Sequence, residues 1–136
     1  MKKVLLLLLV FCNIAFASDY ELKLYEKVLT SIFKKTPIKV YADTKIRRIL
    51  RESYMFNVTS ICDDTVSVVI GRRVNDLPLE CQDKPIFATN YRVYKKNQNA
   101  FGAFYWRKGR PQLKLNKERM QTLNLSLPND LQKYIR

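Results

Sequence analysis

One aromatic stretch near the C-terminus, residues 100–116 (AFGAFYWRKGRPQLKLN), constrains the fold more than any other part of the chain. It holds the single tryptophan and two of the three glycines. Two runs of strand-forming residues flank a short basic turn at residues 107–110, a pattern that predicts a β-hairpin. Pro111 has no backbone N–H, so the returning strand is expected to begin there or to lie at a sheet edge. Because aromatic side chains bury large areas, we expect the core to form around this hairpin.

The first residues have the pattern of a secretory signal peptide. Two lysines precede an apolar run over residues 4–11, and an A-x-A cleavage site occupies residues 15–17. The apolar run is too short to cross a bilayer as a helix, and the bulky residues before Cys12 argue against lipidation. We therefore expect residues 1–17 to be removed and residues 18–136 to form a single periplasmic α/β domain. An uncleaved anchor is the alternative.

Two cysteines, Cys62 and Cys81, remain after the signal peptide is removed. An even count in an exported chain favours a disulfide, and a loop of about 20 residues is worth about 3 kcal/mol on the chain-entropy model. A redox pair or a metal site is the alternative. The chain has no histidine and no Cys-x-x-Cys spacing, so we expect a structural disulfide and no metal site.

The charge balance is strongly basic. The full chain carries a formal +13, which falls to +11 without Lys2 and Lys3. Such a charge favours acidic partners, namely nucleic acid, anionic lipid or an acidic protein face. The alternative is a solvated surface with no specific partner.

The mature chain opens with an α/β pattern. Residues 19–35 have apolar side chains at three- and four-residue spacing, which predicts an amphipathic helix. A short apolar strand is expected at 38–42, followed by a helix at 45–53 with an N-cap at Asp43-Thr44. Together these segments are typical of the start of an α/β layered domain.

Three further strands are expected before the hairpin, at residues 56–61, 65–70 and 85–89. The second of them is apolar enough to lie in the centre of a sheet. The connecting segments are predicted to be a loop at 72–84 and either a short helix or an exposed connection at 91–99.

Short helices are expected after the hairpin. Asn116 can cap a helix that contains Met120, and Asn124 suits the position just after the end of that helix. A last helix contains Leu131. The sequence as a whole predicts an α/β fold: a single compact domain with a mixed sheet of about five strands flanked by helices, and a C-terminal antiparallel hairpin followed by short helices.

The residues needed for catalysis are missing. No histidine is present to act as a base near neutral pH, and no S-x-x-K, G-x-S-x-G or phosphate-loop motif occurs. The single adjacent acidic pair, Asp63-Asp64, is typical of a turn with capping carboxylates. We therefore expect no catalytic residue, no cofactor and no enzymatic activity.

Two basic segments with interleaved aromatic residues are candidates for partner contact. The candidate residues are Arg92, Tyr94, Lys95, Lys96, Arg107, Lys108 and Arg110. Such residues can bind an acidic protein face, where Tyr, Trp and Arg are enriched. They can also stack on bases and bind phosphates, although export argues against nucleic acid. Alternatively, the aromatic residues belong to the core and the cations are their solvated neighbours.

The C-terminal half resembles the YfiR-like family of small periplasmic regulators. The resemblance covers about residues 85–135. Its pieces are PIFATN at 85–90, FGAFY at 101–105, LKLN at 113–116 and LSLPNDL at 125–131. The Trp-Pro that follows the first helix in the family is absent from this chain.

The resemblance implies a periplasmic, non-enzymatic α/β protein. Such a protein would bind the periplasmic region of an inner-membrane signalling protein, typically a diguanylate cyclase, and hold it inactive until redox state or envelope stress relieves the inhibition. No catalytic residue is carried over by the resemblance. The alternatives are a small periplasmic solute-binding protein and a basic envelope protein that binds anionic lipid or nucleic acid. Formation of a homodimer stays open.

Overall fold

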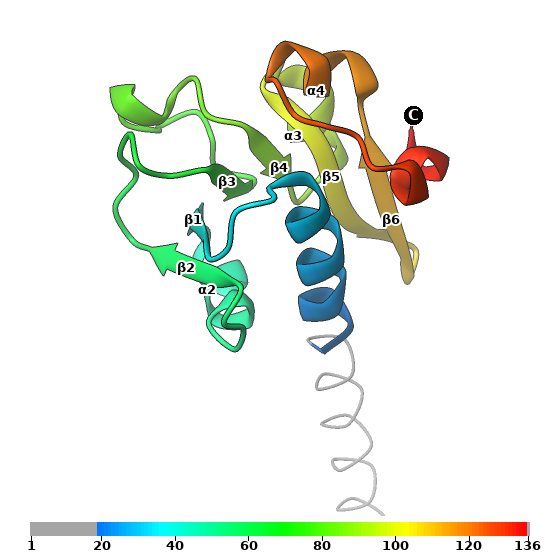
Figure 1. Cartoon of the computed structure of the whole chain (residues 1–136), viewed down its shortest axis with the longest axis horizontal. Helices are drawn as coiled ribbons and strands as arrows, with labels where there is room; N and C mark the ends of the chain where they lie inside the picture. Colours follow the sequence, from blue (N-terminus) through cyan, green and yellow to red (C-terminus); the bar gives the residue numbers. More distant parts are fainter. Residues whose placement is uncertain (1–18, 136) are drawn as a thin grey trace, which may run out of the picture.

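A six-stranded mixed sheet is the centre of the fold in the computed structural model, which describes residues 19–135 (Figure 1). The predicted signal peptide and its cleavage site lie outside the described residues. The strands are β1 (Ile38–Ala42), β2 (Phe56–Thr59), β3 (Val68–Gly71), β4 (Ile86–Ala88), β5 (Ala100–Arg107) and β6 (Arg110–Leu115). This confirms the predicted α/β class and the mixed sheet, and each of the six segments expected to be a strand contributes to it.

The helices are short apart from the first one. Residues 19–32 are helical, and the other elements are α2 (Thr44–Leu50), α3 (Tyr91–Lys96), α4 (Lys117–Thr122) and the 3-10 helices η1 (Leu79–Cys81) and η2 (Asn129–Tyr134). The segment at 91–99 thus begins as a helix, and the last predicted helix is 3-10 rather than α. None of the helices in the described part of the chain has the length and apolar character needed to cross a membrane.

The strand order is β2-β1-β3-β4-β5-β6, and β3 lies between β1 and β4 as its apolar sequence predicted. The first five strands are parallel, while β6 pairs with β5 in the antiparallel direction. The order 2-1-3-4-5 is that of a doubly wound sheet. In such a sheet the chain moves from β1 outward to β2 and then returns to the other side of β1, so the order reverses between β1 and β3.

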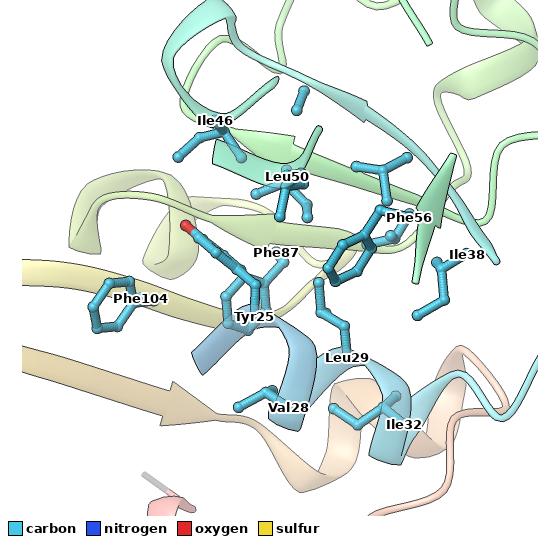
Figure 2. Packing of buried hydrophobic residues seen from close by; sticks show 14 of the residues in the cluster. Tyr25, Val28, Leu29, Ile32, Ile38, Ile46, Leu50, Phe56, Phe87 and Phe104 are labelled. Atoms are coloured by element: carbon cyan, nitrogen blue, oxygen red, sulfur yellow. The ribbon is translucent and has the colours of Figure 1, made fainter. Parts of the chain in front are cut away.

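The larger core lies on the face covered by the N-terminal helix and α2 (Figure 2). The ring of Tyr25 meets those of Phe87 and Phe104 edge-on, with centroids 5.9 and 6.0 Å apart. The ring of Phe87 also contacts that of Phe101, with their centroids 5.7 Å apart. Such aromatic pairs stabilise the fold beyond the burial of their area. This face therefore contains the aromatic core that was expected to form around the hairpin.

The opposite face is covered by α3 and by the long connections on either side of β3. Its smaller core contains both cysteines with Val69, Ile86 and other buried residues. Cys62 and Cys81 form a disulfide with their Cα atoms 5.9 Å apart, which confirms the predicted pairing. The bond joins the segment after β2 to η1, so it holds together a cover that has little regular secondary structure.

The predicted hairpin is confirmed, and its turn has two residues. Arg107 pairs with Arg110, leaving Lys108 (φ 50) and Gly109 (φ 74) at the tip. Positive φ at both central residues is the type I′ geometry that matches the twist of the strands. Pro111 lies in β6, the edge strand, where its missing N–H is tolerated.

Gly102 is required where β5 passes over the core. A β-bulge shifts the register between β4 and β5 next to this residue. A Cβ atom on Gly102 would lie 2.8 Å from Leu115 Cδ2 and 2.9 Å from Phe87 Cε2, closer than packed side chains approach. The absence of a side chain at Gly102 therefore leaves room for the Phe87 ring to pack against β5.

The helix caps follow the sequence in one case and depart from it in another. The Asn116 side chain accepts a hydrogen bond from the Arg119 N–H at 2.9 Å, and Asn124 has a positive φ of 57, as predicted. Asp43 occupies the N-cap position of α2 but makes no capping hydrogen bond. Its Oδ2 instead accepts from the Arg72 N–H at 3.0 Å, because β1 and β3 are neighbours in the sheet.

Candidate functional site

The predicted contact residues fall into two separate groups. Arg92, Lys95 and Lys96 are exposed on α3, whereas Arg107, Lys108 and Arg110 are exposed at the hairpin tip. The C-terminal end of α3 lies beside the start of β5, because the Arg119 guanidinium donates to the carbonyl oxygens of both Lys95 and Ala100. β5 then runs for eight residues to the tip, about 23 Å at the usual rise of a strand. Lys95 and Lys96 therefore lie far from the tip, whereas Arg92 follows Tyr91, whose ring centroid is 6.1 Å from that of Tyr105 near the end of β5.

Tyr94 is not available as a contact residue, which corrects the prediction. Its side chain is only 6% exposed and packs in the smaller core. The Arg119 guanidinium lies 5.4 Å from its ring centroid and donates to its backbone carbonyl. Burial raises the pKa of the Tyr94 hydroxyl above its usual value. Its position at the inner face of α3 explains the difference, since a helix hides one residue in every three or four.

The hairpin tip carries three cations close together. Arg107 and Arg110 stand directly opposite each other, an arrangement in which like charges repel. Within the described range, ion pairs form only between Lys23 and Asp19 and between Lys39 and Asp63, so none involves the tip. The tip therefore presents uncompensated positive charge to the solvent.

Two exposed aromatic rings lie beside this charge. Trp106 is 42% exposed and Tyr20 is 46% exposed, and their ring centroids are 5.9 Å apart. The Trp106 Nε1–H donates to Oε1 of the buried Glu21 at 2.8 Å, which fixes the orientation of the indole. The sequence left the tryptophan between the core and a partner contact, and it gave Tyr20 and Glu21 no role. No local signal joins residues that are 85 positions apart.

A cavity of about 550 Å³ opens at the same edge of the sheet. It lies where β1, β3, β4 and β5 end, and Trp106 belongs both to its wall and to the surface at the tip. The residues that line it are Glu21, Tyr25, Tyr41, Ala42, Asp43, Thr44, Lys45, Ile46, Arg47, Arg72, Arg73, Thr89, Asn90, Phe104, Tyr105 and Trp106. The sequence did not predict this cavity, since its lining comes from five separate segments.

Positive charge exceeds negative charge around the cavity. Four cations line it, Lys45, Arg47, Arg72 and Arg73, against the two carboxylates of Glu21 and Asp43. Both carboxylates already accept hydrogen bonds, from the Trp106 indole and from the Arg72 backbone respectively. The only side-chain bond made by the four cations is from Arg47 Nη2 to Thr44 Oγ1, 3.1 Å, within the described residues. An anion would therefore meet cations that are free to turn towards it.

Gly71 makes room for one of these carboxylates. A Cβ atom at this position would lie 2.5 Å from Asp43 Oδ2. The end of β3 can therefore approach β1 closely enough for the Asp43 carboxylate to reach the Arg72 N–H. The glycine and the carboxylate together set the position of Arg72 at the rim.

Across residues 19–135 no group of three or more His, Cys, Asp or Glu side chains is placed to hold a metal ion. The class defined by this structure is a single α/β domain with a doubly wound sheet order and a basic edge. No family model, curated protein or solved structure matches the chain.

Proposed function

We propose that this protein is an exported, non-enzymatic regulatory protein that binds the periplasmic region of an inner-membrane signalling protein of the diguanylate cyclase type. The hairpin tip, Arg107, Lys108 and Arg110 with the adjacent Trp106 and Tyr20, is the contact surface. The resemblance to YfiR-like regulators supports the class of partner. The disulfide, which is typical of oxidising compartments, supports export.

The observation that carries the proposal is the unpaired charge of the tip. Two arginines opposite each other repel, and an acidic face on a partner would remove that repulsion and form bidentate pairs with them. Trp and Arg are also the residues on which interface energy concentrates. Beside the cations of α3, the exposed aromatic side chain is that of Tyr91. Lys114 already covers it, with its Nζ 4.6 Å from the ring centroid.

The test is crosslinked co-purification with solubilised inner membranes. The full chain is compared with the variant Arg107→Glu/Lys108→Glu/Arg110→Glu. We expect the unaltered chain to recover one membrane protein with a periplasmic sensor region and a cyclase domain. The variant should recover at least about tenfold less of this protein. Because all three side chains are exposed, the thermal midpoint of the variant should stay near that of the unaltered chain.

The matched control is Lys34→Glu/Lys35→Glu/Arg51→Glu. These three cations are also exposed, and the net charge changes equally, but they lie after the N-terminal helix and after α2, far from the tip. Equal losses in the two variants would indicate a general charge effect and contradict the assignment. Recovery of nucleic acid or anionic lipid in place of a signalling protein would favour the basic envelope protein instead.

A further inference from the structure

The doubly wound strand order indicates where a ligand would bind in this fold. Open sheets of this kind bind ligands in the crevice outside the carboxyl ends of the strands, at the point where the strand order reverses. Here that point lies between β1 and β3, and the cavity is lined by the residues that follow both strands, Asp43 and Arg72. Its volume of about 550 Å³ falls in the usual range for small-molecule sites.

We propose that this cavity binds a small organic anion in which a carboxylate or phosphate group is attached to a planar ring. The inference concerns the cavity alone and does not depend on the partner proposed for the hairpin tip. Its chemistry follows from three features of the lining: a tyrosine hydroxyl that faces the cavity without a protein partner, an excess of cations and several aromatic rings.

The hydroxyl that faces the cavity belongs to Tyr25. The residue is 1% exposed, yet its hydroxyl makes no hydrogen bond with any residue in the described range. Every fully buried side-chain N or O atom of that range has a partner, so the Tyr25 oxygen must reach the cavity that its side chain lines. In Figure 2 this oxygen points away from the packed rings and towards Ile46, another lining residue.

A ligand would supply the missing partner. Because this oxygen faces the cavity, a bound acceptor would replace solvent there and accept a hydrogen bond from the hydroxyl. Burial, together with the charges of Glu21 and Asp43, raises the pKa of the Tyr25 hydroxyl above its usual value of 10.0. The hydroxyl therefore stays protonated at neutral pH and can donate a hydrogen bond to an anion.

The cations explain the sign of the ligand. Arg72 and Arg73 follow β3 and are exposed at the rim, while Lys45 and Arg47 approach from α2. Guanidinium groups bind carboxylate and phosphate through two parallel hydrogen bonds. Since Glu21 and Asp43 are held by Trp106 and by the Arg72 backbone, they do not neutralise these side chains through an ion pair.

The aromatic rings of the lining explain the planar ring of the ligand. Phe104 and Trp106 lie on the face of the N-terminal helix, with ring centroids 5.8 Å apart. Tyr41 and Tyr105 pack on the opposite face of the sheet and reach the cavity from there. The bond from Trp106 to Glu21 fixes the indole before any ligand arrives. A planar group bound against a fixed ring gains stacking and burial without ordering that side chain anew.

The experiment measures binding by isothermal titration to the full mature chain with four probes. Adenosine monophosphate combines a ring with a phosphate, and phenylacetate combines a ring with a carboxylate. Adenosine has the ring without the charge, and inorganic phosphate has the charge without the ring. We expect one of the two ring-bearing anions to bind at least about tenfold more tightly than either adenosine or phosphate. Which of the two binds identifies the anionic group.

Two variants assign that binding to the cavity. Tyr25→Phe removes only the unpaired hydroxyl, so it should weaken binding about tenfold while the thermal midpoint does not fall. Arg72→Ala/Arg73→Ala removes two exposed cations, keeps the Arg72 backbone N–H and should weaken binding by at least about tenfold. The control Arg48→Ala/Arg51→Ala removes two exposed arginines outside the cavity lining and should change little.

Three outcomes would overturn the inference. One is that neither ring-bearing anion saturates the protein up to about 10 mM, a concentration that corresponds to a negligible affinity. Another is that neither ring-bearing anion binds more tightly than inorganic phosphate, since the ring would then contribute nothing. The third is an equal loss of affinity in the control variant and in the cavity variants.

Discussion

The two faces of the sheet are stabilised in different ways. One face is covered by the N-terminal helix and α2 and packs a connected set of aromatic rings, among them Tyr25, Phe87 and Phe101. The other is covered by α3 and by irregular segments, and its core contains smaller side chains and the disulfide. Helices can bury a wide apolar stripe, whereas irregular segments cannot.

This difference shows where a covalent bond is needed. The segment from Cys62 to Cys81 contains β3 and the turn η1, and the disulfide closes it across 19 positions. A crosslink restricts the unfolded chain, and its contribution depends on the length of the closed loop rather than on burial, so it adds to the stability of this less helical cover. Substitutions that leave a cavity should therefore destabilise the aromatic face most, and reduction of the disulfide should destabilise the opposite face most.

Substitutions of two neighbouring residues of β4 compare the faces directly. Phe87 faces the aromatic core and Ile86 the smaller one. We expect Phe87→Ala to lower the free energy of unfolding by about 3–5 kcal/mol, since its ring contacts are lost and the cavity cannot collapse. Ile86→Ala should cost about 2 kcal/mol because irregular segments can move in. Denaturation in urea measures both, and a larger loss for Ile86→Ala would contradict the comparison.

Removal of the disulfide tests the face of the sheet that contains the smaller core. Cys62→Ala/Cys81→Ala should lower the free energy of unfolding by about 3 kcal/mol, as expected for a loop of this length. Hydrogen exchange should rise mainly between residues 62 and 81, while the helix at residues 19–32 keeps its protection relative to global unfolding. Uniform loss of protection in both regions would show that the two faces do not differ locally.

The smallest effect expected is at Asp63, next to the disulfide. Its Oδ1 accepts hydrogen bonds from the Thr65 hydroxyl and from the Thr65 N–H at 2.9 Å, and Lys39 lies 3.7 Å away. These hydrogen bonds, with a further contribution from the Lys39 charge, hold the pKa of Asp63 below its usual value of 3.8. Because the folded pKa is the lower one, the carboxylate stabilises the fold above pH 3.8, and this contribution is lost as the pH falls through the folded value.

Asp63→Asn should therefore be slightly less stable than the unaltered chain at neutral pH and equally stable once the pH is below the folded pKa. Thermal unfolding across this pH range measures the difference. A difference that persists at the lowest pH would mean that the carboxylate charge is not the cause. The effect is small because this side chain is exposed and its ion pair is screened by solvent.

Local signals in the sequence predicted much of the fold. The hairpin follows from its glycine-containing turn and its flanking strand-forming residues, and the α4 cap follows from Asn116. The disulfide follows from the even cysteine count that remains after the predicted signal peptide is left out. Each of these depends on a few neighbouring residues or on composition.

The candidate sites depend on pairing between distant segments, which local patterns do not encode. Asp43 has the right residue type for a cap, yet the adjacency of β1 and β3 redirects its carboxylate to Arg72. Tyr94 directly precedes the exposed Lys95 on α3, and the orientation of the helix decides which of the two is buried. The cavity exists only once the strand order brings Tyr25 and Arg73 to the same edge.

The central claim is that the hairpin tip at the carboxyl edge of the sheet contacts a membrane signalling protein. A photo-crosslinking amino acid placed at position 108 tests it most directly, with position 34 as the exposed control at the far end of the N-terminal helix. In living cells, position 108 should give a single crosslinked inner-membrane protein with a periplasmic region and a cyclase domain, and position 34 should give none. Absence of this product at position 108, or equal yield at both positions, would contradict the claim.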